Sequence, residues 1–157
     1  MHHYFGNKEQ LFIATVAMPI DPREFLPQVV AGGKDEVGER LVRTFLSVWD
    51  SPVGHAGAAL LRSAMSSEWT ARLLREFLVT QILRRVVKLI DLDPAEAPLR
   101  MTLVATQMAG LAMVRYILKI EPLASAPREV IVAAIAPTVQ RYVTGDLSAA
   151  KQPAEAG

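Results

Sequence analysis

Apolar residues recur along most of this chain at spacings of three and four, which is the period of one face of an α-helix. Prolines, glycines and small polar residues stand between these stretches, where they start or end helices. The pattern predicts helices over residues 7–17, 22–31, 36–50, 54–65, 68–90, 98–120 and 127–144. Apolar residues make up 51% of the 157 residues and aromatic residues 6%, so the core must be aliphatic and alanine-rich. This composition favours helices over sheets, and we expect an all-α fold.

Local signals at the helix ends support these bounds. Asp35 and Ser67 each stand where a side-chain oxygen can accept a bond from a free amide in the first turn of the following helix. Pro137 lies inside the last predicted helix and is expected to bend it, since it removes one backbone hydrogen bond. Gly145 is a typical C-terminal stop for that helix. The small, polar residues 146–157 are then expected to form a disordered tail.

Two of the central helices have an unusual composition. The helix predicted over 54–65 is rich in alanine and glycine, which let helix backbones approach closely or leave room for a ligand. The sequence alone does not separate these two interpretations. The helix predicted over 68–90 carries five cations: Arg72, Arg75, Arg84, Arg85 and Lys88. A nucleic-acid site would interleave aromatic residues with them, so we interpret these cations as a solvated face.

Composition and spacing argue against catalytic and metal chemistry. The chain has no cysteine, and its 3 histidines are two neighbours near the N-terminus and the distant His55. Neighbouring residues on a helix point in different directions, so no metal site is predicted. Gly32-Gly33 lacks the spacing of a phosphate-binding loop, and the serines at 63, 66 and 67 have no histidine nearby in the sequence. We therefore expect no enzymatic activity, no cofactor and no metal.

Residues 101–118 are mostly apolar, so a membrane span has to be weighed. Gln107 lies near the middle of this stretch and Arg115 near its end, and the flanks do not suit a span. A buried or interfacial helix in a soluble dimer is the favoured interpretation, with no membrane partner. No signal peptide precedes the first predicted helix, which implies the cytoplasm. The net charge of +1 is close to neutral, whereas a body that binds nucleic acid would be more basic.

The N-terminal stretch is the most specific part of the sequence. It predicts the end of one helix, a tight Gly6-Asn7 turn, and a second helix that begins at Lys8. The order His-Tyr-Phe-Gly-Asn-Lys-Glu-Gln-Leu-Phe resembles the end of the DNA-binding domain in the TetR family of one-component transcriptional repressors. The resemblance implies that His2, His3 and Tyr4 sit at or beside the DNA and that Lys8 reaches a phosphate.

The family pattern also requires two further helices and the front of the recognition helix before Met1. The chain as given is therefore expected not to bind an operator specifically, and operator DNA is a partner only if the missing N-terminal helices are present. A histidine-tag remnant at the N-terminus and a start codon placed too late both stay open. The expected organisation is a truncated helix-turn-helix end over 1–17, a hinge loop over 18–33, a ligand-binding and dimerisation domain over 34–145, and the tail over 146–157.

A weaker resemblance covers the body of the chain over residues 36–145. Gly38-Glu39-Arg40-Leu41, Trp49-Asp50 and the run from Gly110-Leu111-Ala112 to Arg115-Tyr116 look like the regulatory domain of actinobacterial-type TetR members. The resemblance implies a TetR-like regulatory helical bundle, and a transcriptional repressor in which a small molecule controls DNA binding. The alternative is a stand-alone helical dimer that binds a ligand or partner without DNA recognition.

The last two predicted helices are apolar on more than one face, and a monomer would leave one of these faces exposed. Pairing with a second copy as a four-helix bundle would bury it. The residues expected at this homodimer interface are Leu111, Val114, Ile117, Leu118, Ile131, Ile135, Val139 and Tyr142. A small apolar or amphipathic ligand is expected between the helices of the body. The candidate residues for its pocket are Trp49, Leu60, Met65, Trp69, Phe77, Met101, Gln107 and Met108.

Overall fold

The structure is a computed structural model that describes residues 22–148, with side chains from Phe25 onward. These residues form helices and no strand, which confirms the expected all-α fold. The α-helices are α2 (Pro22–Val30), α3 (Val37–Trp49), α4 (Val53–Ser66), α5 (Glu68–Phe77), α6 (Arg84–Ile90), α7 (Ala97–Leu111) and α8 (Arg128–Thr144). The shorter segments are the 3-10 turns η1 (Lys34–Glu36) and η4 (Leu123–Ser125) and the π-helical segments η2 (Leu78–Leu83) and η3 (Ala112–Ile117).

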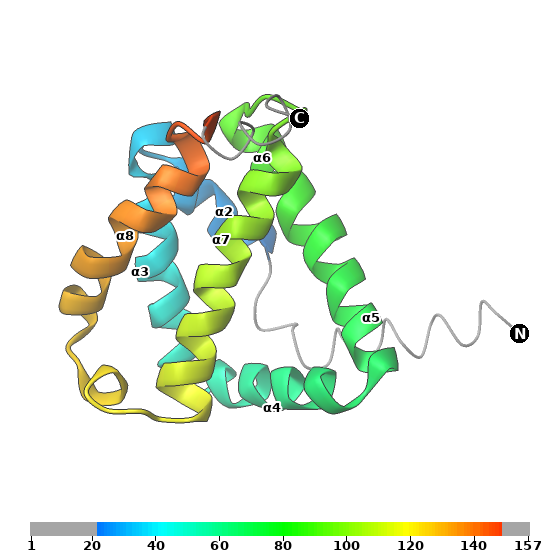
Figure 1. Ribbon diagram of the computed structural model, residues 1–157, viewed down its shortest axis with the longest axis vertical. Coiled ribbons are helices and arrows are strands. Elements are labelled where there is room, and N and C mark those ends of the chain that lie inside the picture. Colours follow the sequence, from blue (N-terminus) through cyan, green and yellow to red (C-terminus); the bar gives the residue numbers. More distant parts are fainter. Residues whose placement is uncertain (1–21, 149–157) are drawn as a thin grey trace, which may run out of the picture.

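The helices lie on several sides of the protein rather than stacking in one layer (Figure 1). Helix α8 packs against both α3 and α7 and forms the main body with them. Helix α4 runs across one end of this body, and α5, η2 and α6 continue from it as one long helix on the other side (Figure 1). This long helix meets the rest of the fold mainly near its two ends, where α5 contacts α4 and α6 contacts α2.

Two separate groups of apolar side chains hold the helices together. The main core joins α2, α3, α6, α7 and α8, and Leu46 and Val139 at its centre are both 0% exposed. The smaller core lies between α4 and α5, where Leu60 and Leu73 are buried with Trp69 and other partly buried residues packed on them. Full burial of one large aliphatic side chain contributes about 1.5–3 kcal/mol, so the main core supplies most of the stability.

The helix ends can be compared directly with the sequence signals. Ser67 caps α5 as predicted, because its Oγ accepts a hydrogen bond from the Thr70 N–H at 3.3 Å. The prediction for Asp35 was wrong. This residue lies within η1, and α3 begins after Glu36 with no side-chain cap bond. Gly145 ends α8 as predicted.

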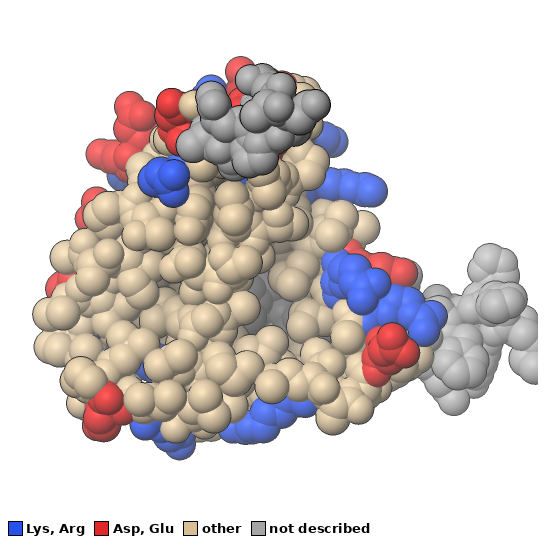
Figure 2. Space-filling view, in the orientation of Figure 1, with Lys and Arg blue, Asp and Glu red and all other residues tan. Residues whose placement is uncertain are grey.

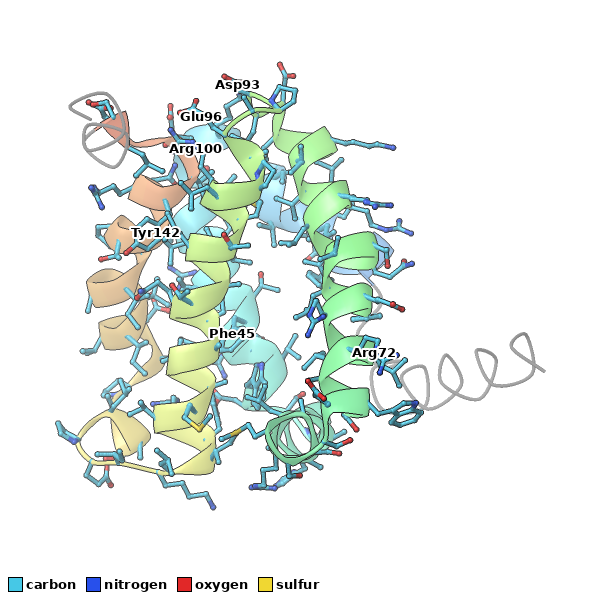
Figure 3. The ribbon with its side chains drawn as sticks, turned by 45° about the vertical axis from the view of Figure 1, so that its right-hand side comes forward. Phe45, Arg72, Asp93, Glu96, Arg100 and Tyr142 are labelled. Atoms are coloured by element: carbon cyan, nitrogen blue, oxygen red, sulfur yellow. The ribbon has the colours of Figure 1, made fainter. Side chains whose placement is uncertain are left out.

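A buried arginine fixes the C-terminal end of α8. Arg100 of α7 is 8% exposed, and it donates from Nη1 to the Tyr142 carbonyl at 3.0 Å and from Nη2 to the Gly145 carbonyl at 2.7 Å. Its Nη2 also lies 3.6 Å from Glu96 Oε1 (Figure 3). The last carbonyls of a helix have no partner within it and carry its negative pole, so a guanidinium is well matched to this position.

The cations of α5 and α6 lie largely in solvent, as expected for a solvated face. Arg72 points outward (Figure 3), and of the five cations only Arg85 is half-buried. Arg85 Nη2 donates to Gln81 Oε1 at 3.2 Å.

Some predictions fall outside the described residues, namely everything placed at residues 1–21 and at 149–157. Packing continues beyond α8 at least to Leu147, which is 7% exposed. Within residues 22–148, no helix is long and apolar enough to cross a membrane.

Candidate ligand site and dimer face

The surface is hollowed between α7 and the long helix of α5, η2 and α6 (Figure 2). The main core borders this hollow on the α7 side, and the smaller core borders it on the α5 side. Among residues 22–148, α5 makes its chief contacts with α4 and with its own continuation, and few with α7. This is the place in the fold that best matches the ligand site expected from the sequence.

Five of the eight residues predicted for the pocket belong to the two cores, whereas Trp49, Met65 and Gln107 belong to neither. The half-buried ones are Trp49, Trp69, Phe77, Gln107 and Met108. Leu60 is 8% exposed and belongs to the smaller core, and Met101 is 3% exposed and belongs to the main core. Met65 is 65% exposed near the end of α4, so its side chain lies at the surface and not in an interior pocket. The remaining seven could share a ligand only across the hollow.

Two surface grooves flank the charged edge of α3 instead. The larger one, of about 400 Å³, is lined by Asp35, Glu39, Arg43, Glu129, Val132, Ala133, Ala136, Pro137 and Gln140. The smaller one, of about 360 Å³, is lined by Gln28, Glu36, Glu39, Arg40, Arg43 and Thr44. None of the eight predicted residues lines either groove. Arg43 pairs with Glu39 at 2.7 Å and also with Glu129, so these rims are ion-paired surface rather than an apolar site.

Trp49 lies where α3, α4 and η3 meet. Its ring centroid is 5.6 Å from that of Phe45 and 5.4 Å from that of Tyr116 in η3. A Cβ added at Gly57 of α4 would lie 3.3 Å from the indole, and one at Gly54 would lie 2.0 Å from the Trp49 carbonyl oxygen. At these two positions the small residues of α4 therefore serve close helix approach, which was one of the two interpretations left open by the sequence.

A polar cluster beside Trp49 was not singled out as a site by the sequence. Asp50 Oδ1 accepts a hydrogen bond from the Tyr116 hydroxyl at 2.7 Å, and Asp50 Oδ2 accepts one from Arg128 Nε at 3.1 Å. Arg115 Nη2 lies 3.9 Å from Asp50 Oδ1. We call these four residues the Asp50 cluster. They join the end of α3 to η3 and to the first residue of α8.

Burial and electrostatics favour the neutral phenol in this cluster. Burial, and then the hydrogen bond to Asp50, raise the pKa of Tyr116 to about 12. The hydroxyl is therefore a hydrogen-bond donor throughout the neutral pH range. A signal for the cluster was present in the sequence, because Arg115 interrupts an apolar stretch and a buried cation needs partners.

The predicted dimer residues fall on two sides of α7, η3 and α8. Leu111 is 3% exposed, Ile131 2% and Val139 0%, so these three hold the protomer's own core together and do not face a second copy. The half-buried ones are Val114, Ile117, Ile135 and Tyr142. Leu118 is 58% exposed. The large aliphatic side chains of these helices thus point mostly inward.

The exposed residues in the middle of the same helices are small and uncharged, whereas Leu99, Val130, Glu129 and Arg141 are exposed nearer the helix ends. The small, uncharged ones are Thr102, Ala105, Thr106, Ala109 and Gly110 on α7 and Ala133, Ala134, Pro137 and Thr138 on α8. Figure 2 shows a broad area over α7 and the middle of α8 with no Lys, Arg, Asp or Glu on it. We call this surface the α7–α8 face.

Nothing in the described part of the chain tests the predicted DNA contacts, because His2, His3, Tyr4 and Lys8 all lie outside it. Over residues 22–148, no group of three His, Cys, Asp or Glu side chains is placed to hold a metal ion, and His55 is exposed on α4.

Comparison with known proteins decides the family. The family described as "Tetracyclin repressor-like, C-terminal domain" matches residues 35–143, which is more than half of the chain. The chain belongs to the TetR family. A crystal structure of a TetR-family regulator from Streptomyces coelicolor A3 is similar to it, with 34% sequence identity and a TM-score of 0.62, over 90% of this chain and 73% of that chain. A search of the curated proteins gave no match.

The match confirms the TetR resemblance seen in the sequence, and with it a regulatory helical fold. TetR-family regulators are transcription factors without enzymatic activity, so the expectation that this protein is not an enzyme is confirmed by its family.

Proposed function

We propose that this TetR-family protein is a homodimeric transcriptional repressor of the cytoplasm, and that a small apolar or amphipathic ligand controls its DNA binding. The match to the regulatory-domain family over residues 35–143 carries the proposal. The division of the apolar side chains between two cores supports the ligand-controlled part. A ligand between the cores would contact both and would favour one arrangement of them over the other. Sites of this kind lie between helices and are mostly apolar.

The α7–α8 face is the proposed contact with the second copy. Small residues on this face allow close approach of helices, and the absence of charge means that no unpaired ion is buried on association. A Cβ at Gly110 would meet no other atom within 4 Å in the protomer. Pairing of this face with its own copy gives a closed two-fold dimer.

A Gly110→Leu variant tests this contact. In the protomer the new side chain extends into open space, so the variant should fold, but in a dimer it would hold the paired helices apart. Sedimentation velocity should give a dimer for the unchanged protein and a monomer for Gly110→Leu. Ala59→Leu is the matched control, because Ala59 is exposed on α4, and this variant should remain dimeric. A dimeric Gly110→Leu variant would contradict the proposed face.

The ligand site is tested with an anilinonaphthalene sulfonate dye, whose fluorescence rises in apolar surroundings. Met108→Trp adds bulk beside the hollow and should weaken dye binding by roughly tenfold, which corresponds to about 1.4 kcal/mol. Ala59→Trp adds the same ring to an exposed position and should leave dye binding unchanged. Equal affinities of the two variants would mean that the dye binds elsewhere than in the hollow.

The DNA-binding part is tested with a chain completed at its N-terminus by the missing helices of the helix-turn-helix, by selecting duplexes from a random pool. A two-fold dimer should select a palindrome whose half-sites lie about one helical turn, or a multiple of it, apart. A compound that competes with the dye should then release this duplex. If no palindrome is enriched although the protein is dimeric, the better description is a helical dimer that binds a ligand without DNA recognition.

A further inference from the structure

One carboxylate joins three helical elements. Asp50, which directly follows α3, binds Tyr116 of η3 through Oδ1 and Arg128, the first residue of α8, through Oδ2. Segment η3 continues helix α7, and α7 and α8 together carry the α7–α8 face. A change in the position of Asp50 therefore acts on one end of both helices of this face.

The connection between η3 and α8 is held by the same cluster. Arg115, whose side chain is 10% exposed, donates from Nη1 to the Leu123 carbonyl at 2.7 Å and to the Ala126 carbonyl at 3.0 Å. Its guanidinium carbon lies 5.4 Å from the centroid of the Tyr116 ring. Hydrogen bonds from a cation are about twice as strong as neutral ones, and the partial burial strengthens them further. The cluster is therefore a stiff joint between α3 and the start of α8.

The Asp50 cluster also contacts helix α4, through the neighbouring Trp49. Trp49 precedes Asp50, and its ring lies between the Tyr116 ring and the backbone of α4 at Gly57. Helix α4 carries Leu60 of the smaller core. A movement of α4 toward α3 would displace the indole, since a Cβ at Gly57 would already lie 3.3 Å from the ring, which is a tight contact. Such a movement reaches Asp50 through the Tyr116 ring and hydroxyl.

We propose that the Asp50 cluster is a coupling joint: it makes the environment of Trp49 and the pairing of the α7–α8 face change together. The inference rests on the proposed dimer and adds to it a route from the α4 side of the protein to the interface. Coupling of two sites is reciprocal in free energy, so formation of the dimer must alter the surroundings of Trp49 just as displacement of Trp49 must alter dimerisation. This reciprocity allows a test that needs no ligand.

The experiment uses the Trp69→Phe chain, in which Trp49 is the remaining one of 2 tryptophans. Sedimentation and Trp49 fluorescence are recorded over the same dilution series. The expected result is a change in Trp49 emission whose midpoint coincides with dimer dissociation. Asp50→Asn, which weakens both of the bonds that the carboxylate accepts, should shift dissociation to roughly tenfold higher concentration, equivalent to about 1.4 kcal/mol, and abolish the emission change.

Two further variants separate coupling from loss of stability. Glu129→Gln removes another ion pair between α3 and α8, the one with Arg43, and leaves the Asp50 cluster intact. It should keep the emission change. Tyr116→Phe removes only the hydroxyl and keeps the ring against Trp49, so it reports on the joint even if Asp50→Asn fails to fold. It should reduce the emission change.

The outcomes distinguish the two levels of the proposal. If the Trp69→Phe chain and the unchanged protein are both monomeric at every concentration, the proposed dimer fails and the coupling joint fails with it. If the dimer forms but Trp49 emission is constant across dissociation, the dimer stands and the coupling is refuted. If Glu129→Gln and Asp50→Asn behave alike, the effect belongs to any contact between α3 and α8, and the Asp50 cluster has no special role.

Discussion

The crossing of α3 and α8 gives the most quantitative prediction of the structure, through the variant Gly38→Ala. A Cβ at Gly38 would lie 2.8 Å from the Ala136 carbonyl oxygen and 2.8 Å from the Gln140 backbone nitrogen, both on α8. Contacts this short are relieved only by moving one helix, because backbone atoms cannot rotate away. The Gly38 N–H also donates to Gln140 Oε1 at 2.7 Å, so any separation of the helices lengthens a hydrogen bond as well.

The expected change in the free energy of unfolding is the difference between destabilising and stabilising contributions. Overpacking of this kind typically costs about 1–3 kcal/mol, and a weakened hydrogen bond adds up to about 1 kcal/mol. Replacing glycine by alanine in a helix returns at most about 1 kcal/mol. The expected net loss is about 1–2 kcal/mol, and since each kcal/mol corresponds to about 2–4 °C for a chain of this size, the melting temperature should fall by roughly 3–6 °C. Urea unfolding followed by circular dichroism measures the same loss at constant temperature.

Gly110→Ala is the matched control, because the substitution is identical and the surroundings are the opposite. A Cβ there meets nothing within 4 Å, so the helix propensity term acts alone and should raise the stability of the protomer by about 0.5–1 kcal/mol. Unfolding is followed at low protein concentration, where association contributes least. A Gly38→Ala variant as stable as the unchanged protein would refute the assigned packing of α3 on α8. A destabilised Gly110→Ala protomer would refute the open surroundings of Gly110.

Two further predictions concern the polar groups. Arg100→Met should lower the free energy of unfolding by about 2–3 kcal/mol, because it leaves the Tyr142 and Gly145 carbonyls without their charged donor, and Arg100→Lys should recover part of the loss in the same urea titration. The Tyr116 pKa lies at about 12, above its ordinary value of 10.0, so the neutral phenol stabilises the fold fully below pH 10 and this stabilisation is lost as the pH rises toward 12. The chain has 3 tyrosines, so the phenolate absorbance of Tyr116 is taken as the difference between the unchanged protein and Tyr116→Phe. This difference should titrate late, and a difference that titrates at the ordinary pKa would contradict the burial of Tyr116 and its bond to Asp50.

The helices themselves were predictable from the sequence because their signals are local. The period of the apolar residues, the cap at Ser67 and the stop at Gly145 each act within one or two turns. The prediction that Asp35 caps a helix was wrong because it, too, used only a local signal. The sequence shows a residue type that can cap, but whether the chain enters the helix directly or through a 3-10 turn depends on packing, and here η1 rests against α8.

The Asp50 cluster could not be predicted as a unit, because its bonds join residues far apart in the chain. The Tyr116 hydroxyl and Asp50 are separated by 66 residues, and Arg128 and Asp50 by 78. In the sequence, Trp49-Asp50 and Arg115-Tyr116 resemble the family only as two separate pairs. Their meeting depends on how α7 and α8 cross α3, and no local pattern encodes that crossing.

The same limit applies to the predicted dimer residues. Helices α7 and α8 are apolar over most of their circumference, so the periodicity does not say which side faces the protomer. The structure separates the sides by size: Ile131 and Val139 fill the core, whereas Ala133 and Pro137 are exposed. Large side chains gain most from burial in a closely packed core, whereas small ones allow another helix to approach. Residue size, added to polarity, would have distinguished the core side of these helices from their exposed side.

The two cores differ in how many apolar side chains they bury, and this difference gives the proposed ligand control a physical basis. The main core ties α3, α7 and α8 together, whereas the smaller one holds α4 to α5 with Leu60 and Leu73 as its buried residues. Segments with few buried apolar contacts open at lower free energy than the rest of a protein. A ligand in the hollow would add apolar contacts where the protein has fewest, and would bias the position of α4 more than that of α3 or α8. Because Trp49 lies against α4 and Tyr116 together, this bias acts on the Asp50 cluster before it reaches any other part of the α7–α8 pair.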